Sequence, residues 1–154
     1  MIKLQPVLKD YLWGGEKLKT LFGRRADGIV AESWEASVHR DGVSTIAGSG
    51  KTFTGYLAAN PTAVDKNGGD FPVLIKYIDA AKNLSVQVHP DDEYALKNEG
   101  QYGKTEMWYV VDNDEGAGIY LGFKEDTDKD TFMKAVENGT VLDLLNFFPG
   151  KKGE

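Results

Sequence analysis

The chain has 154 residues, of which 41% are hydrophobic and 27% are charged, and these proportions are typical of a soluble globular protein of one domain's length. Twenty-four acidic residues against 18 basic ones give a net charge of −6, which argues against nucleic acid or an anionic membrane as the main partner. The sequence contains no cysteine, so disulfides and thiolate metal sites are excluded, and a bound metal would need histidine, carboxylate, amide or water ligands.

The N-terminus lacks the apolar core of a signal peptide, and the sequence has no apolar run of 18 residues. We therefore expect a cytoplasmic protein with no membrane partner. The net negative charge does not exclude a phosphorylated small molecule, because a few local basic residues are enough to bind one. The sequence carries no indication of an oligomeric state.

Eighteen glycines and five prolines are spread evenly along the chain and divide it into short segments, a pattern that indicates a β-rich fold. The pattern of apolar and polar residues predicts strands over six segments, which are 28–39, 43–49, 72–80, 84–89, 105–112 and 118–123. The last two are separated by the loop 113–117 and are expected to form a hairpin.

Helices are expected at fewer places. Residues 91–98 begin with acidic residues, which favour the positive end of a helix dipole. Residues 128–139 have apolar residues at helical spacing and end at Gly139, a residue type common just after a helix. The segment 140–148 fits either a short helix or a strand.

The segment 84–89 carries polar side chains on one of its two faces. In a strand, Ser85, Gln87 and His89 would point to the same side, with Gln87 and His89 about 7 Å apart at the backbone. Seventeen residues after His89 lies Glu106, a carboxylate inside an aromatic-rich segment. If an intervening helix returns the chain, these three side chains can share one divalent cation, and the donor set suits Zn²⁺ but also Mn²⁺, Fe²⁺ or Ni²⁺. Three ligands with one open position are typical of a catalytic site.

The spacing leaves other roles open. His89 can equally be a histidine at a strand end that hydrogen-bonds to Asp91 or Asp92. These two acids are candidate general bases, but they can also cap the helix at 91–98 and complement its dipole.

Two further charged residues stand out because their neighbours are apolar or aromatic. Lys76 lies within a predicted strand of apolar residues, so we expect it to have an acidic partner or to reach solvent. Glu35 is expected to line a pocket or to form an ion pair across strands.

Five segments, in this order along the chain, resemble the type I mannose-6-phosphate isomerases in the shorter form found in Gram-positive bacteria. They are YLWGGEKL (11–18), ESWEAS (32–37), FPVLIKYIDA (71–80), LSVQVHPDDEYA (84–95) and KTEMWYV (104–110). The resemblance implies a mainly β fold, a cupin-type jelly-roll β-barrel that is partial here, with a few short helices. It also implies a zinc-dependent enzyme that interconverts two sugar phosphates, mannose 6-phosphate and fructose 6-phosphate, by enediol proton transfer.

The same resemblance implies roles for individual residues. Gln87, His89 and Glu106 correspond to three zinc ligands of the family. Lys104 corresponds to its active-site lysine, and Ser85 to a serine that lines the substrate pocket near the phosphate.

The chain departs from the family pattern at its end. The family has a fourth ligand, a histidine, and a catalytic arginine beyond the last residue here, and His39, the second histidine of this sequence, does not match that ligand's motif. We therefore expect residues 1–154 to be a single domain, the N-terminal part of a cupin-type isomerase truncated before the last ligand strand, with little turnover alone. The alternative is a non-catalytic cupin-like sugar-binding domain. A third possibility, a metal-dependent oxygenase, would need two histidines on the metal. The scarcity of histidine in this sequence disfavours it.

Overall fold

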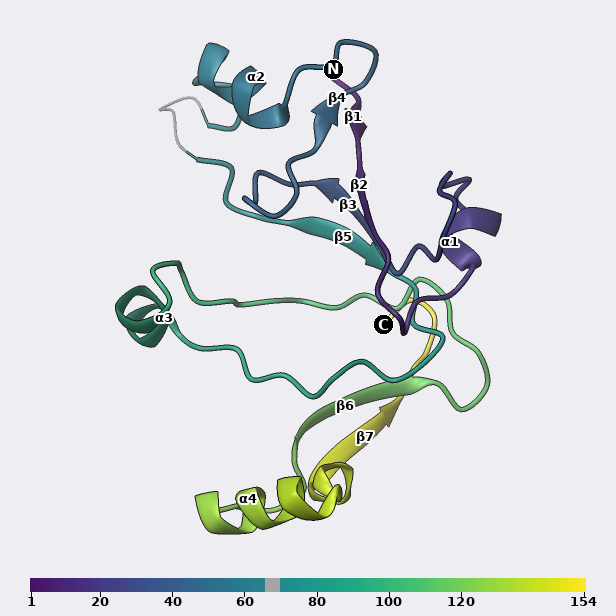
Figure 1. The fold of residues 1–154 in the computed structure, drawn as a ribbon, viewed down its shortest axis with the longest axis vertical. Coiled ribbons are helices and arrows are strands. Elements are labelled where there is room, and N and C mark those ends of the chain that lie inside the picture. Colours follow the sequence, from purple (N-terminus) through teal and green to yellow (C-terminus); the bar gives the residue numbers. More distant parts are fainter. Residues whose placement is uncertain (66–69) are drawn as a thin grey trace. The chain divides into compact units, whose positions relative to one another are not determined.

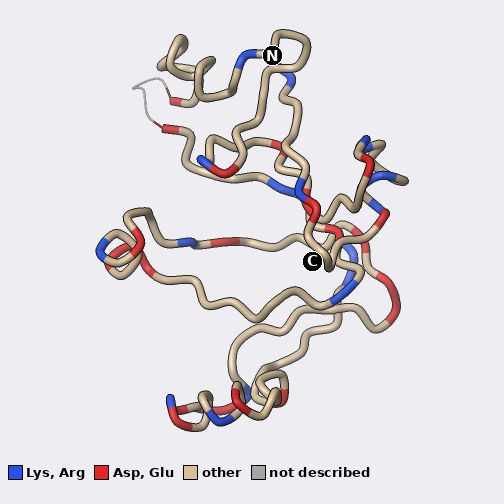
Figure 2. The backbone as a smooth tube through the Cα atoms, in the orientation of Figure 1, with Lys and Arg blue, Asp and Glu red and all other residues tan. Residues whose placement is uncertain are grey.

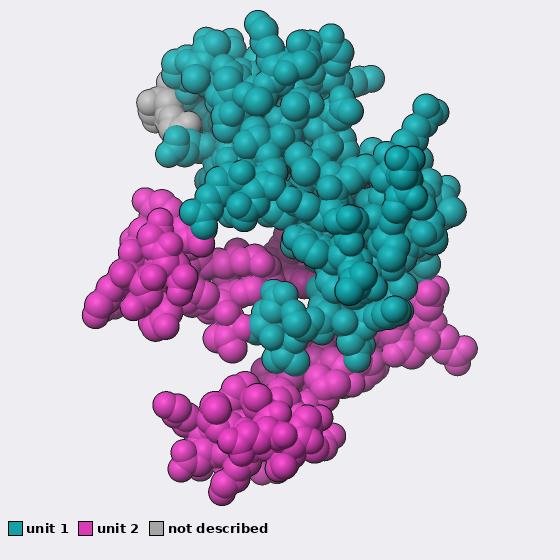
Figure 3. All heavy atoms as spheres, in the orientation of Figure 1, with its two compact units in different colours: residues 1–87 teal, residues 88–154 magenta. Residues whose placement is uncertain are grey.

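A computed structural model describes residues 1–65 and 70–154. The chain divides into two compact units, residues 1–87 and 88–154 (Figure 3). The first unit contains β1 (Leu4–Gln5), β2 (Val7–Lys9), α1 (Lys17–Thr20), β3 (Glu32–Ala36), β4 (Thr45–Ile46), α2 (Phe53–Ala59) and β5 (Ile75–Ile78). The second contains α3 (Asp92–Asn98), β6 (Gly118–Phe123), α4 (Lys129–Asn138), a 3-10 helix η1 (Val141–Leu144) and β7 (Leu145–Pro149).

An antiparallel sheet of three strands, in the order β2-β3-β5, forms the centre of the first unit (Figure 1). The short strands β1 and β4 form a separate antiparallel pair. The side chains of Val30, Ala31 and Trp34, on and just before β3, are almost completely buried, and Leu18 and Phe53 add helix residues to this core. The buried residues of this unit thus include Trp34 of the middle strand, which has a neighbouring strand on each side.

Within this sheet, the buried carboxylate of Glu32 has two side-chain partners, Lys76 on the neighbouring strand β5 and Trp34 on its own strand. Lys76 Nζ lies 2.8 Å from Glu32 Oε1, and Trp34 Nε1 donates to Glu32 Oε2 at 2.6 Å. The prediction of an acidic partner for Lys76 is confirmed. Glu35 also forms an ion pair, in its case with Arg24 at 2.6 Å.

The second unit contains an antiparallel pair of strands, β6 and β7, in which Ile119 lies opposite Phe148. Helix α4 connects them through η1 (Figure 1). Asp128 caps the start of α4 by accepting from the backbone N–H of Thr131 at 2.7 Å, which lowers the pKa of its carboxyl. Gly139 ends the helix with φ at 69°, in the left-handed region that glycine tolerates best.

Several predicted elements are confirmed. Strands β3, β4 and β5 lie inside three of the predicted segments, and β6 covers residues 118–123 as expected. Helices α3 and α4 occur at the predicted places, and the ambiguous segment 140–148 contains both alternatives, η1 followed by β7. Helix α1 was not predicted; the side chain of Asp79, distant in sequence, accepts from the N–H groups at its start. Helix α2 and strands β1 and β2 were not predicted either.

Two predicted strands, 84–89 and 105–112, are wrong as hydrogen-bonded strands, because neither forms a ladder in the structure. The predicted hairpin between 105–112 and 118–123 is also wrong, since β6 pairs with β7. Val110 instead exchanges backbone hydrogen bonds with the end of the chain, donating to Glu154 O at 2.7 Å and accepting from Gly153 N at 2.8 Å. Alternation predicts an extended backbone, but it does not say which segment will pair with it.

The predicted fold class is confirmed: short strands in open antiparallel sheets are combined with a few short helices, an arrangement compatible with part of a cupin-type barrel. No helix within residues 1–65 and 70–154 has the length and apolar character needed to span a membrane. Helices α3 and α4 each carry both signs of charge (Figure 2). The prediction that residues 1–154 form a single domain stays a prediction.

Candidate functional site

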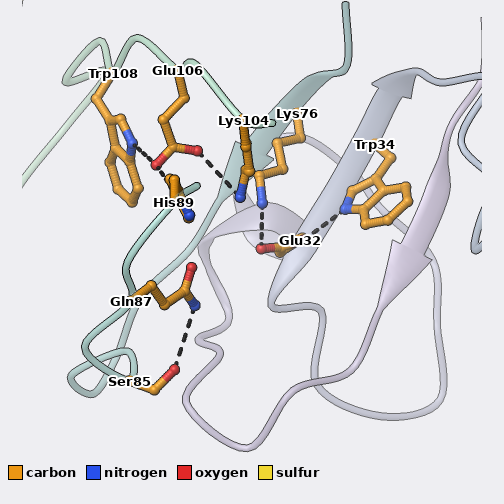
Figure 4. Close-up of polar contacts among 9 residues, drawn as sticks. All are labelled: Glu32, Trp34, Lys76, Ser85, Gln87, His89, Lys104, Glu106 and Trp108. Atoms are coloured by element: carbon orange, nitrogen blue, oxygen red, sulfur yellow. Dashed lines mark hydrogen bonds and ion pairs between the residues drawn. The ribbon is translucent and has the colours of Figure 1, made fainter. Parts of the chain in front are cut away.

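His89 and Glu106 meet in the second unit, as their spacing predicted. The Nε2 atom of His89 lies 3.0 Å from Oε1 of Glu106 (Figure 4). Both side chains are partly buried, with 24% and 29% of their surfaces exposed. The chain between them passes through α3, so an excursion containing a helix brings residue 106 back to residue 89.

The carboxylate of Glu106 is held by three side chains. Besides His89, the indole Nε1 of Trp108 donates to Oε1 at 3.0 Å, and the ammonium of Lys104 lies 3.3 Å from Oε2 (Figure 4). Lys104, Glu106 and Trp108 occupy alternate positions of an extended segment, which places their side chains on one side of it. The local alternation thus gathers a cation and an indole donor around one acid.

This environment keeps Glu106 ionised. Partial burial would raise the pKa of its carboxyl, but the hydrogen bonds from Trp108, His89 and Lys104, together with the charge of Lys104, outweigh burial and lower the pKa to about 2. An ionised carboxylate can only accept, so Nε2 of His89 carries the shared hydrogen. At neutral pH the site therefore offers a formed carboxylate next to an imidazole.

The donors at this point suit a divalent metal. Two ligand atoms bound to one tetrahedral zinc at about 2.0–2.1 Å lie roughly 3.3 Å from each other, close to the 3.0 Å between His89 Nε2 and Glu106 Oε1. Loss of the shared hydrogen would leave His89 Nε2 and Glu106 Oε1 both able to bind a metal. In the described part of the chain, no group of three or more His, Cys, Asp or Glu side chains is placed to hold a metal. Further ligands would therefore have to be an amide, water or groups from elsewhere.

Gln87 and Ser85 are the remaining predicted site residues, and they belong to the first unit. Their side chains contact each other, because Gln87 Nε2 donates to Ser85 Oγ at 3.4 Å (Figure 4). They therefore lie on the same side of the extended chain, as alternation predicted. The structure brings His89, Lys104 and Glu106 together. The roles of Gln87, His89 and Glu106 as metal ligands, of Lys104 in catalysis and of Ser85 as a substrate contact all stay predictions.

The carboxylate that bonds to His89 is Glu106, and Asp91 and Asp92 have other partners. Asp91 caps α3, accepting from Tyr94 N at 2.8 Å, as one of the alternatives for this residue predicted. Asp92 instead accepts from the backbone N–H of Gly103 at 2.9 Å. This contact and the hydrogen bond from Trp108 were missed from the sequence. The alternation of Glu106 and Trp108 would have indicated the indole, whereas nothing local indicated the Asp92 contact.

Comparison with known proteins decides the family. Residues 1–121 match the family model described as phosphomannose isomerase type I, catalytic domain. A mannose-6-phosphate isomerase of Streptococcus mutans is 36% identical over an alignment of 158 positions, which covers 98% of this chain. The chain belongs to the type I phosphomannose isomerase family.

Solved structures support the membership. The crystal structure of the mannose 6-phosphate isomerase from Bacillus subtilis matches 99% of this chain with a TM-score of 0.89 and 36% identity. A structure of a mannose 6-phosphate isomerase bound with zinc and yttrium matches 65% of this chain and 28% of that chain, with a TM-score of 0.55 and 30% identity. The chain spans about half the length of two of these relatives, 49% for the Streptococcus mutans enzyme and 50% for the Bacillus subtilis structure.

Proposed function

We propose that residues 1–154 supply the N-terminal portion of the site of a metal-dependent aldose–ketose isomerase that interconverts mannose 6-phosphate and fructose 6-phosphate. The observation that carries the proposal is the ionised carboxylate of Glu106, held between His89, Lys104 and Trp108. Membership of the type I phosphomannose isomerase family supports the choice of substrate.

Zinc is the metal that we propose, with Gln87, His89 and Glu106 as its ligands from this chain. A bound divalent ion would polarise a sugar carbonyl or a water molecule and stabilise negative charge on oxygen. Trp108 and Lys104 would hold the Glu106 carboxylate in place, since each contacts one of its oxygens.

Isomerisation moves a carbonyl between C1 and C2 of the sugar, and in the route we propose a proton leaves one carbon and returns to the other through an enediol. Lys104 directs one N–H group to Glu106 and has two further donors for a sugar oxygen. Its side chain is 47% exposed, so substrate can reach it. Ser85 would contact the sugar phosphate through its hydroxyl.

An isomerase assay tests the proposal. The 154-residue chain is compared with a chain extended by about 150 residues, about one further domain. We expect turnover in the extended chain and little in the short one. In the extended chain, His89→Ala and Glu106→Gln should abolish both turnover and zinc binding, whereas the second histidine provides a matched control, because His39→Ala should leave both unchanged.

Failure of the extended chain to bind zinc would rule out the metal-dependent isomerase. Turnover by the 154-residue chain alone would contradict the prediction that these residues have little activity by themselves. A non-catalytic sugar-binding domain gives a third pattern: Glu106→Gln would leave binding of mannose 6-phosphate intact, and no form would turn it over.

A further inference from the structure

Two hydrogen bonds join the beginning and the end of the excursion that carries α3. The Oδ1 atom of Asp92 accepts from Gly103 N at 2.9 Å, and the carbonyl of Pro90 accepts from Lys104 N at 3.2 Å. The two connections involve residues 90 and 92 on one side and residues 103 and 104 on the other. We call this pair of connections, centred on Asp92 and Gly103, the latch.

The latch brings the two backbone segments so close that Gly103 has no room for a side chain. A Cβ atom at Gly103 would lie 2.5 Å from Pro90 O, 2.6 Å from Asp91 C and 2.8 Å from Asp92 N. All three are backbone atoms, which cannot rotate away as the end of a flexible side chain can. Its φ is not in the left-handed region, so glycine is needed here for close approach and not for its backbone conformation.

The candidate site begins next to the latch on both segments. His89 immediately precedes Pro90, and Lys104 immediately follows Gly103, with Glu106 two residues later. Separating the segments would therefore move His89 away from Glu106, whose side chains now approach to 3.0 Å.

We propose that Asp92 and Gly103 set the distance between His89 and Glu106, and that Asp92 is a positioning residue for the metal and sugar-phosphate site. The expected effect on catalysis rests on the proposed function. The claim that the latch sets the distance between His89 and Glu106 does not. Asp92 has its Oδ1 atom committed to the Gly103 amide, which suits a structural acceptor better than a group that must exchange protons with substrate.

Nuclear magnetic resonance on the metal-free 154-residue chain tests the geometric claim. Asp92→Ala should speed hydrogen exchange of the Gly103 amide at least about tenfold, because the hydrogen bond protects it. It should also shift the His89 ring and Trp108 indole signals towards those of Glu106→Ala. Asp92→Asn, which keeps an acceptor oxygen, should restore the wild-type signals. Glu93→Ala, which removes another acid from the first turn of α3, is the matched control and should change neither reading.

Gly103→Ala perturbs the latch from the opposite segment, so the test does not depend on one variant folding. It should shift the His89 and Trp108 signals as Asp92→Ala does, with α3 retained in circular dichroism. If Asp92→Ala loses α3, Gly103→Ala decides the question. Unchanged His89 and Trp108 signals in Gly103→Ala, or failure of Asp92→Asn to restore them, would overturn the inference.

Cobalt(II) titration followed by absorption separates this inference from the proposed function. We expect Asp92→Ala and Gly103→Ala to weaken cobalt binding by about 10–100-fold, as loss of a residue that orients ligands does, and Asp92→Asn to bind as the wild type does. If the wild type binds no cobalt even in the extended chain, the proposed function fails, while the resonance shifts still decide the latch. Normal cobalt affinity in both latch variants would overturn the positioning role.

Discussion

At the scale of single residues, Glu106 collects the chemistry of the second unit. Three side chains surround its carboxylate, and two of them lie within two residues of it in sequence. The pKa of about 2 means that the carboxyl does not need to be deprotonated by a metal at neutral pH. By contrast, Nε2 of His89 must lose the hydrogen that it shares with Glu106 before it can bind a metal.

Replacing Glu106 by glutamine keeps the size of the side chain but removes its charge. We expect Glu106→Gln to weaken zinc binding by more than the roughly 10–100-fold that loss of an outer partner costs, because a direct ligand is affected. Competition with a chelating dye measures the dissociation constant. The exposed Glu137 on α4 provides the control, since Glu137→Gln makes the same chemical change away from the site. Equal effects of the two variants would show that only net charge matters.

In the first unit, Lys76 is the cation that pairs with a buried carboxylate, that of Glu32. Removing it leaves the carboxylate of Glu32, which is 5% exposed, with only the indole of Trp34 as a side-chain partner in the contacts described above. We expect Lys76→Ala to lower the free energy of unfolding by about 1–3 kcal/mol, the cost of leaving a buried polar group poorly satisfied. Urea denaturation measures it. Lys51→Ala, an exposed lysine in the same unit, should change stability by less than about 0.5 kcal/mol.

At the scale of elements, α4 shows how local signals define a helix. A capping aspartate begins it and a left-handed glycine ends it, and both signals lie within the predicted segment. Phe132 of the helix packs against Phe123 of β6, with ring centroids 5.9 Å apart. Capping and packing thus agree, which is why this helix was predicted nearly to the residue.

The end of α4 can be tested directly. Gly139→Ala should destabilise the second unit by about 1–2 kcal/mol, because a Cβ atom is strained in the left-handed region. Thermal unfolding followed by circular dichroism measures the loss. Gly150→Ala is a matched control in the same unit, since its added Cβ would make only ordinary contacts, the nearest at 3.5 Å, without a left-handed backbone. A similar loss in both variants would attribute the effect to glycine replacement in general.

The extended segments beside α3 show where local signals are insufficient. Residues 84–89 and 105–112 alternate as strands do, yet their backbones form no ladder. Alternation reports which side chains share a side, and the contacts among Lys104, Glu106 and Trp108 confirm that part. Pairing depends on which other segment arrives alongside, a non-local event.

At the scale of the whole molecule, many large apolar side chains are exposed in both units. Val88 and Met107 in the second unit are 84% and 90% exposed, and Leu12 in the first is 85% exposed. Tyr109 and Val111 alternate with Met107 along one extended segment and are exposed too. Exposed apolar side chains of this kind favour association with another surface.

We therefore expect the 154-residue chain to bind 1-anilinonaphthalene-8-sulfonate while folded and to self-associate as its concentration rises. Fluorescence and sedimentation velocity measure the two effects. The double variant Val88→Thr/Met107→Gln should reduce both, whereas Leu12→Gln, outside these segments, should reduce them less. Dye binding that is unchanged in the double variant would show that other exposed residues are responsible.

The order of motifs and the alternation of side chains were enough to predict the family, the β-rich class, helices α3 and α4, and the pairing of His89 with Glu106 across 17 residues. The β-rich class and the two helices were readable because each depends on residue type and on spacing within a short segment. The pairing of His89 with Glu106 followed from the family resemblance, because spacing alone left other roles for His89 open.

The partners of most other groups were not readable. Glu32 for Lys76, β7 for β6, Asp79 at the start of α1 and Gly103 for Asp92 all became apparent only in three dimensions. The physical reason is that side-chain chemistry and local conformation are properties of neighbouring residues, whereas a contact between distant residues depends on the path of all the chain between them.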